Sequence, residues 1–384
     1  MFVTHIVLKN WRNFRSVDET ISETTFLIGP NAAGKSNFLD VFRFLRDISK
    51  PQGGGLQKAI TDRGGIPKLR CLHARRETDV RIEISLADAP DAKNPDWKYV
   101  LAFKPDEKGI HRPSIICEQV LRDGRLVLDR PNLEDKKDPE QLTETYLENV
   151  RSNKAFREMA EFFSRTTYLH LVPQLLKFGD RIAGHLLEDD PFGQGFLDRI
   201  AKSSDKVRVA RLRWIEHALT VAIPYFKQLD FERDAAGHPH LKARHEHHRP
   251  NAGWQQEGQF SDGTLRLIGL LWSLLEGDAL LLLEEPELSL NQSIVEQIPL
   301  MLKNILSDRK RRRQVIISTH SEALLSNPGI NAKGVLLLNS GNEGTEVRSI
   351  NDSEANAIES GLSIAEVLLP KTRPSKIEHL GDVF

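Results

Sequence analysis

Short apolar runs separated by polar turns, rather than long hydrophobic stretches, organise this chain of 384 residues. Residues 2–9 (FVTHIVLK) and 24–29 (TTFLIG) have the composition of strands, and the polar stretch around Arg15–Glu19 predicts a turn between them. After the second strand, apolar residues recur at three- and four-residue steps from Phe38 to Leu45, which predicts a helix. The chain therefore opens as strand, turn, strand and helix.

Strand patterns return before residue 130. Three apolar segments at 79–87, 97–104 and 113–121 are followed by VLRDGRLVLD, in which Asp123-Gly124 is typical of a hairpin turn. We expect an antiparallel sheet that is added to the opening elements.

A helical pattern replaces the strand pattern from Asp138 onward. Apolar residues at helical steps predict helices over 140–150 and 154–165, and helical character continues through Leu169–Leu187 and Val207–Val221. No heptad repeat persists in these segments, so we do not expect a long coiled-coil arm.

The last third of the chain has the order helix, strand, helix, strand. Ser261 caps a helix that is apolar nearly all round and therefore buried, and Ala279–Leu283 is a short buried strand. The pattern then predicts a helix over 289–306, kinked at Pro299, and a strand QVIIST that ends before His320. Strand, helix and strand in this order predict a right-handed crossover in a parallel sheet.

The sequence GPNAAGKS at residues 29–36 joins the second strand to the first helix and has the spacing of a phosphate-binding loop. Glycines let successive backbone N–H groups face the phosphates, while Lys35 reaches the β- and γ-phosphates and Ser36 offers a hydroxyl to Mg²⁺. We therefore predict a site for ATP and Mg²⁺. Its predicted nucleotide contacts are Asn31, Ala33, Gly34, Lys35, Ser36 and Asn37.

Three carboxylates follow the buried strand within four residues, in the sequence Glu284, Glu285, Pro286 and Glu287. Neighbouring carboxylates that lose hydration repel one another unless a cation neutralises them. A charged turn without chemistry is the alternative. Because the carboxyl ends of parallel strands meet at one sheet edge, His320 should lie beside Glu284 and Glu285, which favours a functional site.

Composition limits the partners and the compartment that we expect for this protein. There are 53 Lys and Arg against 54 Asp and Glu, so net charge favours neither nucleic acid nor membrane as a partner. Cys71 and Cys117 lack metal-like spacing and indicate a reducing compartment. The first residues lack a signal-peptide pattern, and the longest apolar runs are too short to cross a bilayer. We expect a cytoplasmic protein without membrane contact.

Three segments rich in basic residues or histidine allow more than one interpretation. Residues 237–250 contain five histidines, three of them within 245–248, but without a cysteine or a helical HExxH pattern a solvated loop is favoured over a metal site. The segments 50–70 and 309–313 are basic and could contact phosphates of nucleic acid. For 309–313 a solvated helix-to-strand connection is favoured.

Four motifs in their order resemble the ABC-type ATPases of the RecF/SMC/OLD kind, and most closely the AAA_21-like predicted ATPases of bacteria. They are GPNAAGKS, FSDGT at 260–264, LLLLEEPELSLNQ at 280–292 and ISTHS at 317–321, and LKNWRNFRS at 8–16 is similar to the entry strand of that family. The resemblance covers about residues 1–50 and 255–340. It implies an α/β fold: an ABC-type P-loop ATPase with a mixed sheet core, an antiparallel β subdomain and a helical insertion.

The resemblance also implies roles at the sheet edge. Ser36 and Glu284 would serve Mg²⁺, with Glu284 in its second shell. Glu285 would orient or deprotonate the attacking water, and His320 would hydrogen-bond the γ-phosphate. In this family a glutamine that senses Mg²⁺ usually follows the first helix, and Gln57 is the candidate for it here.

A head-to-tail homodimer around two ATP molecules is implied as well, alone or within a higher oligomer. Ser261 and Gly263 would contact the γ-phosphate bound by the other subunit, and Ser289–Asn291 would form a dimer-contact loop. Arg12 and Asn13 are further candidates for nucleotide contact.

The sequence departs from the family pattern at three places. Glu284 stands where the general pattern has Asp. In FSDGT, which stands at the place of the ABC signature, Asp262 occupies the position where transporter ATPases have Gly, and Thr264 replaces a Gln. We expect residues 1–137 and 226–384 to form the split ATPase domain, with 138–225 as the helical insertion.

For the biological role we expect an ATPase switch that controls a separate effector protein, as in bacterial anti-phage defence. An intrinsic nuclease is not expected, because after His320 the only aspartates are Asp352 and Asp382 and no Asp-x-Asp pair occurs. The alternative is a DNA-binding ATPase of repair or maintenance. A transporter subunit is disfavoured by the diverged signature and the large insertions.

Overall fold

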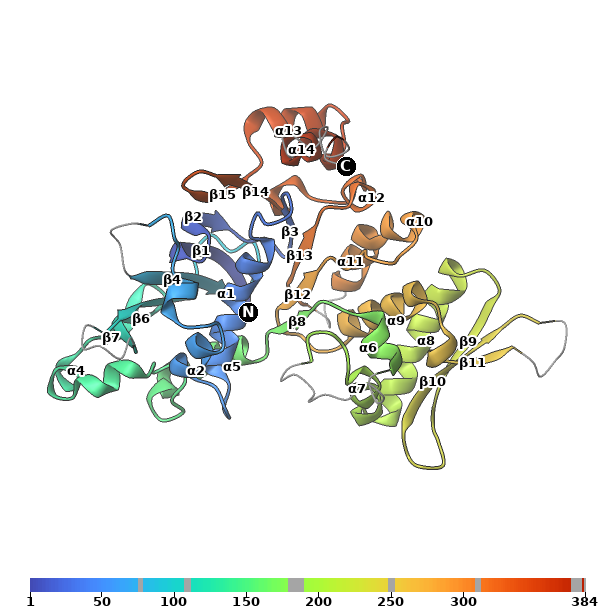
Figure 1. Ribbon diagram of the computed structural model, residues 1–384, viewed down its shortest axis with the longest axis horizontal. Helices are drawn as coiled ribbons and strands as arrows, with labels where there is room; N and C mark the ends of the chain where they lie inside the picture. The colour runs from blue at the N-terminus through green and yellow to red at the C-terminus, as the bar shows by residue number, and fades with distance from the viewer. Residues whose placement is uncertain are drawn as a thin grey trace.

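The computed structural model describes residues 1–74, 79–106, 112–178, 190–247, 253–307, 312–373 and Asp382, and Figure 1 shows their arrangement. A six-stranded mixed sheet lies at the centre, in the order β15-β14-β3-β13-β12-β8. Five of its strands are parallel, and β15 is antiparallel to β14. The strands are β3 (Thr24–Ile28), β8 (Thr167–Leu169), β12 (Leu281–Glu284), β13 (Val315–Thr319), β14 (Val335–Gly341) and β15 (Gly344–Ser349).

Both faces of this central sheet are buried, because its side chains alternate between two hydrophobic clusters. Leu282 and Ile316 belong to a cluster with α1 and the antiparallel sheet, whereas Leu281, Leu283 and Ile317 belong to a cluster with α9 and α11. Strands buried on both faces appear as continuous apolar runs, as in ALLLL and VII. The helices on the two faces are α1 (Lys35–Ser49), α9 (Asp262–Leu275) and α11 (Ile298–Leu306).

An antiparallel sheet packs on the side of α1 opposite the central sheet (Figure 1), in the order β2-β1-β4-β5-β6-β7. Its strands are β1 (Phe2–Trp11), β2 (Phe14–Thr20), β4 (Val80–Ala87), β5 (Trp97–Pro105), β6 (Pro113–Arg122) and β7 (Arg125–Arg130). Short helices border it: α2 (Leu56–Thr61), α3 (Ile66–Leu69), α4 (Leu133–Lys137) and α5 (Arg157–Ser164).

A third layer stands at the far end of the molecule (Figure 1), where a three-stranded sheet packs on a long helix. It consists of α6 (Pro173–Phe178), α7 (Phe196–Lys202), α8 (Asp205–Ala222), β9 (Phe226–Arg233), β10 (Pro239–His245) and β11 (Trp254–Gln256). The remaining helices are α10 (Gln292–Val295), α12 (Glu322–Leu325), α13 (Asp352–Glu359) and α14 (Ile364–Thr372). No helix in the described parts of the chain has the length and apolar content that a bilayer crossing requires.

Most sequence-based elements are confirmed within a few residues. They include the opening strands, the helix after the phosphate loop, the antiparallel strands and the crossover from β12 to β13. Asp123 and Gly124 have φ angles of 48° and 73°, as a two-residue turn between β6 and β7 requires.

The turn predicted at Arg15–Glu19 is wrong, because these residues belong to β2, which pairs with β1. The reversal occurs earlier, at Arg12, whose φ is 51°. The strand is at the sheet edge and exposes Arg15 and Ser16 while it buries Phe14 and Val17, so it looks polar in sequence.

The helix predicted over 140–150 is also wrong, since only a 3₁₀ turn at Pro139–Thr143 forms. Tertiary contacts use the backbone groups that a helix would need. Arg130 donates to the carbonyl oxygens of Gln141 and Glu144, and Glu118 accepts from the backbone N–H of Tyr146. Helical periodicity cannot reveal such competition.

Two further segments differ from expectation. The predicted helix over 289–306 is two helices, α10 and α11, and Pro299 lies in the first turn of α11 instead of kinking its middle. The segment Leu169–Leu187 begins with the end of strand β8 before α6, and its residues 179–187 lie outside the described part.

The histidine-rich segment is not a solvated loop, because 239–245 forms β10. Leu241 and Ala243 are buried there while His240 and Lys242 alternate with them. His240 Nδ1 lies 2.7 Å from Glu257 Oε1, and His248 lies outside the described residues. No group of three metal-ligating side chains occurs in the described residues.

Candidate active site

The phosphate-loop candidate begins at the end of β3 and ends where α1 begins. Ala32 and the N-cap residue Gly34 have φ angles of 65° and 97°, in the left-handed region that glycine tolerates best. Lys35 Nζ donates to the carbonyl oxygens of Gly29 at 2.8 Å and Pro30 at 3.2 Å. Asn31 and Ser36 are exposed on the loop, so their side chains are available to a ligand.

Asn13 supports the loop from the antiparallel sheet. Its Nδ2 donates to the carbonyl oxygen of Ala33 at 2.9 Å and to Thr345 Oγ1 at 2.8 Å, while its Oδ1 accepts from Asn37 Nδ2 at 2.8 Å. A Cβ atom at Gly34 would lie 2.1 Å from Asn13 Nδ2. Asn13 therefore fixes the loop at a position that only glycine can occupy.

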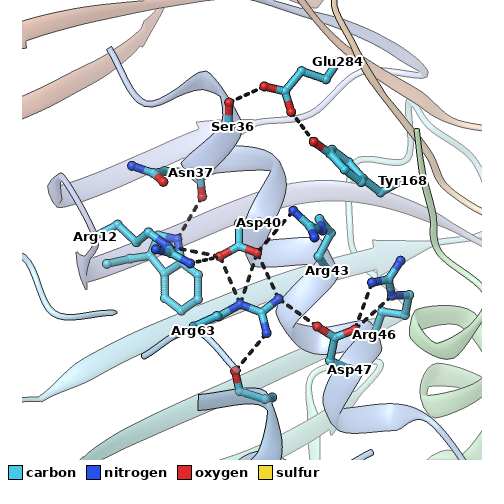
Figure 2. A network of polar contacts seen from close by, with 12 residues as sticks. Arg12, Ser36, Asn37, Asp40, Arg43, Arg46, Asp47, Arg63, Tyr168 and Glu284 are labelled. Atoms are coloured by element: carbon cyan, nitrogen blue, oxygen red, sulfur yellow. Dashed lines mark hydrogen bonds and ion pairs between the residues drawn. The ribbon is translucent and has the colours of Figure 1, made fainter. Parts of the chain in front are cut away.

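Glu284 at the end of β12 lies beside Ser36 at the start of α1 (Figure 2). The Ser36 hydroxyl donates to Glu284 Oε1, and the Tyr168 hydroxyl of β8 donates to Glu284 Oε2. Burial and the bond to Glu284 raise the pKa of Tyr168, so the phenol remains a donor. The start of α1, the end of β12 and the edge strand β8 thus meet at the Glu284 carboxylate.

Glu285 follows β12 in a left-handed conformation with a φ of 44°. This conformation costs a non-glycine residue about 1–2 kcal/mol, and neighbouring elements hold it. Its N–H donates to the carbonyl oxygen of Ser318 at 3.0 Å, and its own carbonyl oxygen accepts from Arg266 Nη1 at 3.0 Å. The side chain then lies 3.1 Å from His320 Nδ1.

Glu287 is buried on the inner side of this edge and accepts a 2.5 Å hydrogen bond from Thr319 Oγ1. Its Oε2 atom is buried without a hydrogen-bond partner. Burial raises the pKa of Glu287, and the Thr319 bond only partly opposes this. Glu287 thus supports the edge from inside, whereas Glu284 and Glu285 face outward.

One ammonium lies near all three carboxylates. Burial lowers the pKa of Lys35, while Glu285, Glu284 and Glu287 oppose that shift electrostatically. The Arg266 guanidinium also interacts electrostatically with Glu287 and Glu285. Three carboxylates near two cations leave an excess of negative charge that a further cation can neutralise. The hydroxyl of Ser36 and the carboxylate of Glu284 are oxygen ligands of the kind that Mg²⁺ prefers, so the residues present fit this ion.

The model of the family described as AAA domain, putative AbiEii toxin, Type IV TA system (AAA_21) matches residues 24–326, more than three quarters of the 384 residues. The chain belongs to the AAA_21 family. It is therefore an ABC-type, RecF/SMC-like ATPase by family, as the four motifs indicated.

Curated relatives match over short segments only. The chain is 33% identical over 92 residues to the DNA replication and repair protein RecF of Roseiflexus castenholzii, covering 22% of this chain and 23% of that protein. It is 40% identical over 53 residues to RecF of Chloroflexus aggregans, covering 14% of each. The matches span less than a quarter of the length of these relatives.

The fold is that of an SMC head. A crystal structure of the SMC head bound to the C-winged helix domain of ScpA aligns with a TM-score of 0.53 over 92% of this chain and all of that one, at 13% identity. The mixed sheet, the antiparallel sheet and the flanking helices of this AAA_21 protein are thus the expected ABC-type architecture.

The signature residues of the AAA_21 protein lie away from the phosphate loop in the sequence, at the start of α9. Ser261 is exposed and accepts from Thr264 N–H as the helix cap. A Cβ atom at Gly263 would lie 2.7 Å from the carbonyl oxygen of Ser289. The structure thus brings the signature to the Ser289 loop, while the described hydrogen bonds of Ser261 do not reach the phosphate loop of the same chain.

Two sequence-based candidates make structural hydrogen bonds, Gln57 and Arg313. Gln57 Nε2 donates to the carbonyl oxygens of Pro113 at 3.0 Å and Thr143 at 2.8 Å, which fixes its amide against β6 and the 3₁₀ turn. A contact with Mg²⁺ would use its Oε1 atom, and this role stays a prediction. Arg313 of the basic run is buried and donates to carbonyl oxygens of Ala279 and Ser273, so it is not part of a solvated connection. Residues 309–311 lie outside the described part.

Sequence analysis missed two side chains at the site, Tyr168 and Arg266. Tyr168 lies in a strand of three residues, for which Thr166-Thr167-Tyr168 was the available signal of β-branched and aromatic residues. Arg266 is buried in α9 and donates to the carbonyl oxygens of Glu285 and Leu171. A lone arginine in the otherwise apolar helix was its signal, since a buried cation requires partners.

Proposed function

We propose that the chain binds ATP with Mg²⁺ at the phosphate loop and hydrolyses it. The observation that carries this proposal is the convergence of two side-chain pairs, Ser36 with Glu284 and Glu285 with His320, at the sheet edge beside Lys35. A phosphate cradle, a cation position, a base and a polar group for the γ-phosphate are what phosphoryl transfer to water requires.

Each residue has a distinct task in this proposal. The loop N–H groups and Lys35 bind the phosphates. Ser36 and, through the water shell, Glu284 would hold Mg²⁺, which supplies charge neutralisation at the phosphate oxygens when bound. Glu285 orients the attacking water and accepts its proton, and His320, 3.1 Å from Glu285 Oε1, hydrogen-bonds the γ-phosphate.

We infer further that two chains enclose the nucleotides head to tail. Ser261 and Gly263 lie on an exposed helix start that makes no described hydrogen bond to its own phosphate loop. A serine cap and the helix N-terminus can bind a phosphate of the partner chain. The homodimer is the minimal assembly, and higher oligomers built from it fit the same contacts.

Glu285→Gln tests hydrolysis. We expect turnover of ATP to fall by about 10²–10⁴-fold, the usual contribution of a general base, with ATP binding retained. Because bound ATP persists in the variant, the dimer should accumulate, which light scattering with and without ATP measures.

Glu359→Gln, an exposed glutamate at the end of α13, is the matched control and should behave as wild type. Undiminished turnover in Glu285→Gln would remove Glu285 from the mechanism. Loss of ATP binding in the same variant would mean that the change damages the loop.

As biological role we propose an ATPase switch that controls a separate effector protein in bacterial anti-phage defence. The family description supports it, since it names a toxin and a toxin–antitoxin system. Co-purification of a toxin or nuclease in the presence of ATP, and its release in the Lys35→Ala variant, is the expected result.

The second candidate is a DNA-associated ATPase, which the similarity to RecF favours. The basic residues that sequence analysis offered for DNA support it less than expected. Arg63, in the 50–70 segment, is buried in ion pairs with Asp40 and Asp47 at 2.9 Å, and Arg313 is buried as well. DNA-stimulated ATPase with a steep loss of binding at higher salt would favour this candidate over the switch.

A further inference from the structure

Tyr168 occupies an unusual position for a buried tyrosine. It is the middle residue of β8, the strand that pairs with β12 in parallel register, Leu169 opposite Leu283. Its hydroxyl donates to Glu284 Oε2 while the Ser36 hydroxyl donates to Oε1 (Figure 2). In the described residues Glu284 has hydrogen bonds from these two neutral hydroxyls and from no arginine or lysine.

The Tyr168 ring is itself held from α1. The Arg43 guanidinium lies 4.1 Å from the ring centroid. Arg43 follows Ser36 by seven residues, or two helical turns, so both side chains leave α1 on the same face and flank Tyr168 and Glu284. One helix thus positions the Ser36 hydroxyl directly and the Tyr168 hydroxyl through the stacked ring.

Arg43 belongs to a larger charge network around Asp40 (Figure 2). Asp40 Oδ1 lies 3.9 Å from Arg43 Nη1 and 2.9 Å from Arg63 Nη2, and Asp40 Oδ2 lies 2.5 Å from Arg12 Nη2. Arg63 connects onward to Asp47 at 2.9 Å. The ring of Tyr168 therefore rests on a guanidinium whose own position is set by a mostly buried network.

We propose that Tyr168 is a positioning residue for Glu284 that raises the affinity of the nucleotide site for Mg²⁺. A carboxylate can turn about its terminal bond and present either oxygen. The Tyr168 hydroxyl fixes Oε2 and thereby directs Oε1 toward Ser36 and the cation position. Outer partners of a metal site commonly contribute about 10–100-fold in metal affinity. This inference rests on the proposed ATP and Mg²⁺ site.

A second tyrosine–glutamate pair provides the comparison that separates positioning from packing. Tyr99 in β5 donates to Glu118 at 3.1 Å and is fully buried. Glu118 also accepts from Arg130 Nη1 at 2.8 Å and from Tyr146 N–H at 2.9 Å, so its orientation does not depend on the phenol. Tyr99→Phe is thus a matched control for Tyr168→Phe: each removes one buried hydroxyl from one glutamate.

The experiment is an equilibrium titration of Mg²⁺ against a fluorescent ADP analogue, which measures binding without turnover. In Tyr168→Phe the Mg²⁺ concentration at half-saturation should rise about tenfold, while binding of the analogue in excess EDTA stays at the wild-type level. Tyr99→Phe should match wild type in both measurements. An unchanged half-saturation in Tyr168→Phe, or an equal rise in Tyr99→Phe, overturns the role of Tyr168.

A second variant keeps the test decisive if Tyr168→Phe folds poorly. Arg43→Met removes the cation from the ring and leaves the hydroxyl, so the half-saturating Mg²⁺ concentration should rise about two- to fivefold. No rise in Arg43→Met contradicts the proposed positioning. If added Mg²⁺ does not change binding of the analogue to the wild-type protein, the proposed Mg²⁺ site and this inference are both overturned. If Mg²⁺ strengthens binding to wild type but the variants show the wild-type half-saturation, only the inference is overturned.

Discussion

Two clusters of buried or half-buried carboxylates lie in different sheets of this molecule, and they are built differently. In the antiparallel sheet, Arg130 lies between Glu118 at 2.8 Å and Asp135 at 2.7 Å, and all three side chains are fully buried. At the edge of the central sheet, Glu284, Glu285 and Glu287 lie near the ammonium of Lys35, and the guanidinium of Arg266 lies near Glu285 and Glu287, but both cations hydrogen-bond to carbonyl oxygens instead.

The clusters differ in how completely their charged and polar groups find hydrogen-bond partners and opposite charges within the protein. Glu118 receives hydrogen bonds from a guanidinium, a phenol and two backbone N–H groups, and Arg130 also donates to two carbonyl oxygens. Glu287 keeps a buried oxygen without a partner, and Glu285 is held at a positive φ. A cluster that needs nothing more is structural, whereas one with excess charge, strain and an unsatisfied atom indicates a ligand.

The largest effect is expected from removing the cation of the satisfied cluster. Arg130→Met leaves Glu118 and Asp135 buried without their partner and should lower the free energy of unfolding by about 3–5 kcal/mol. Urea denaturation measures it, with Arg125→Met, an exposed arginine of the same strand, as the control. A loss below about 1 kcal/mol would show that water reaches this cluster and that it is not the closed structural unit described above.

The same contrast explains what sequence could predict about the site. Lys35, Ser36, Glu284, Glu285 and His320 were found because local spacing and strand order alone bring them to one edge. A phosphate loop has a fixed spacing, and parallel strands have a fixed polarity. Their proposed tasks in catalysis stay predictions.

The residues that support this edge were not predictable in the same way. Strand β8, which carries Tyr168, has three residues and is defined by its pairing with β12. The segment 140–150 has helical periodicity, yet Glu118 and Arg130 take its backbone groups. In both cases the partner lies far away in the sequence, so no local pattern contains the information.

Glu354, a carboxylate outside both clusters that is paired with two cations, tests the same contrast through the pH dependence of stability. Hydrogen bonds from Arg348 and Lys371 hold the pKa of Glu354 down at about 2, although burial opposes this. Its ordinary value is 4.5, so the stabilisation is fully present above about pH 4.5 and is lost as the pH falls toward 2.

Glu354→Gln should therefore lower the free energy of unfolding by about 1–2 kcal/mol at pH 7, and the deficit should shrink at pH 3. Glutamine can still accept from Asn351 N–H in the helix cap, so the change isolates the charge. Glu359→Gln in the same helix is the control. A deficit that is equal at pH 7 and pH 3 would assign the effect to packing instead of charge.

Glu287 should show the opposite dependence, with the smallest effect of the three. Burial raises its pKa, so the folded state takes up a proton more readily than the unfolded state, and stability is lost as the pH rises from 4.5 through the raised value. Glu287→Gln carries no charge and can still accept from Thr319. We expect the variant to match wild type at pH 4 and to be about 1 kcal/mol more stable at pH 8, as urea midpoints measure. A variant that is less stable at pH 8 would mean that Lys35 or Arg266 already neutralises the Glu287 charge, and the sheet edge would then resemble the satisfied cluster around Arg130.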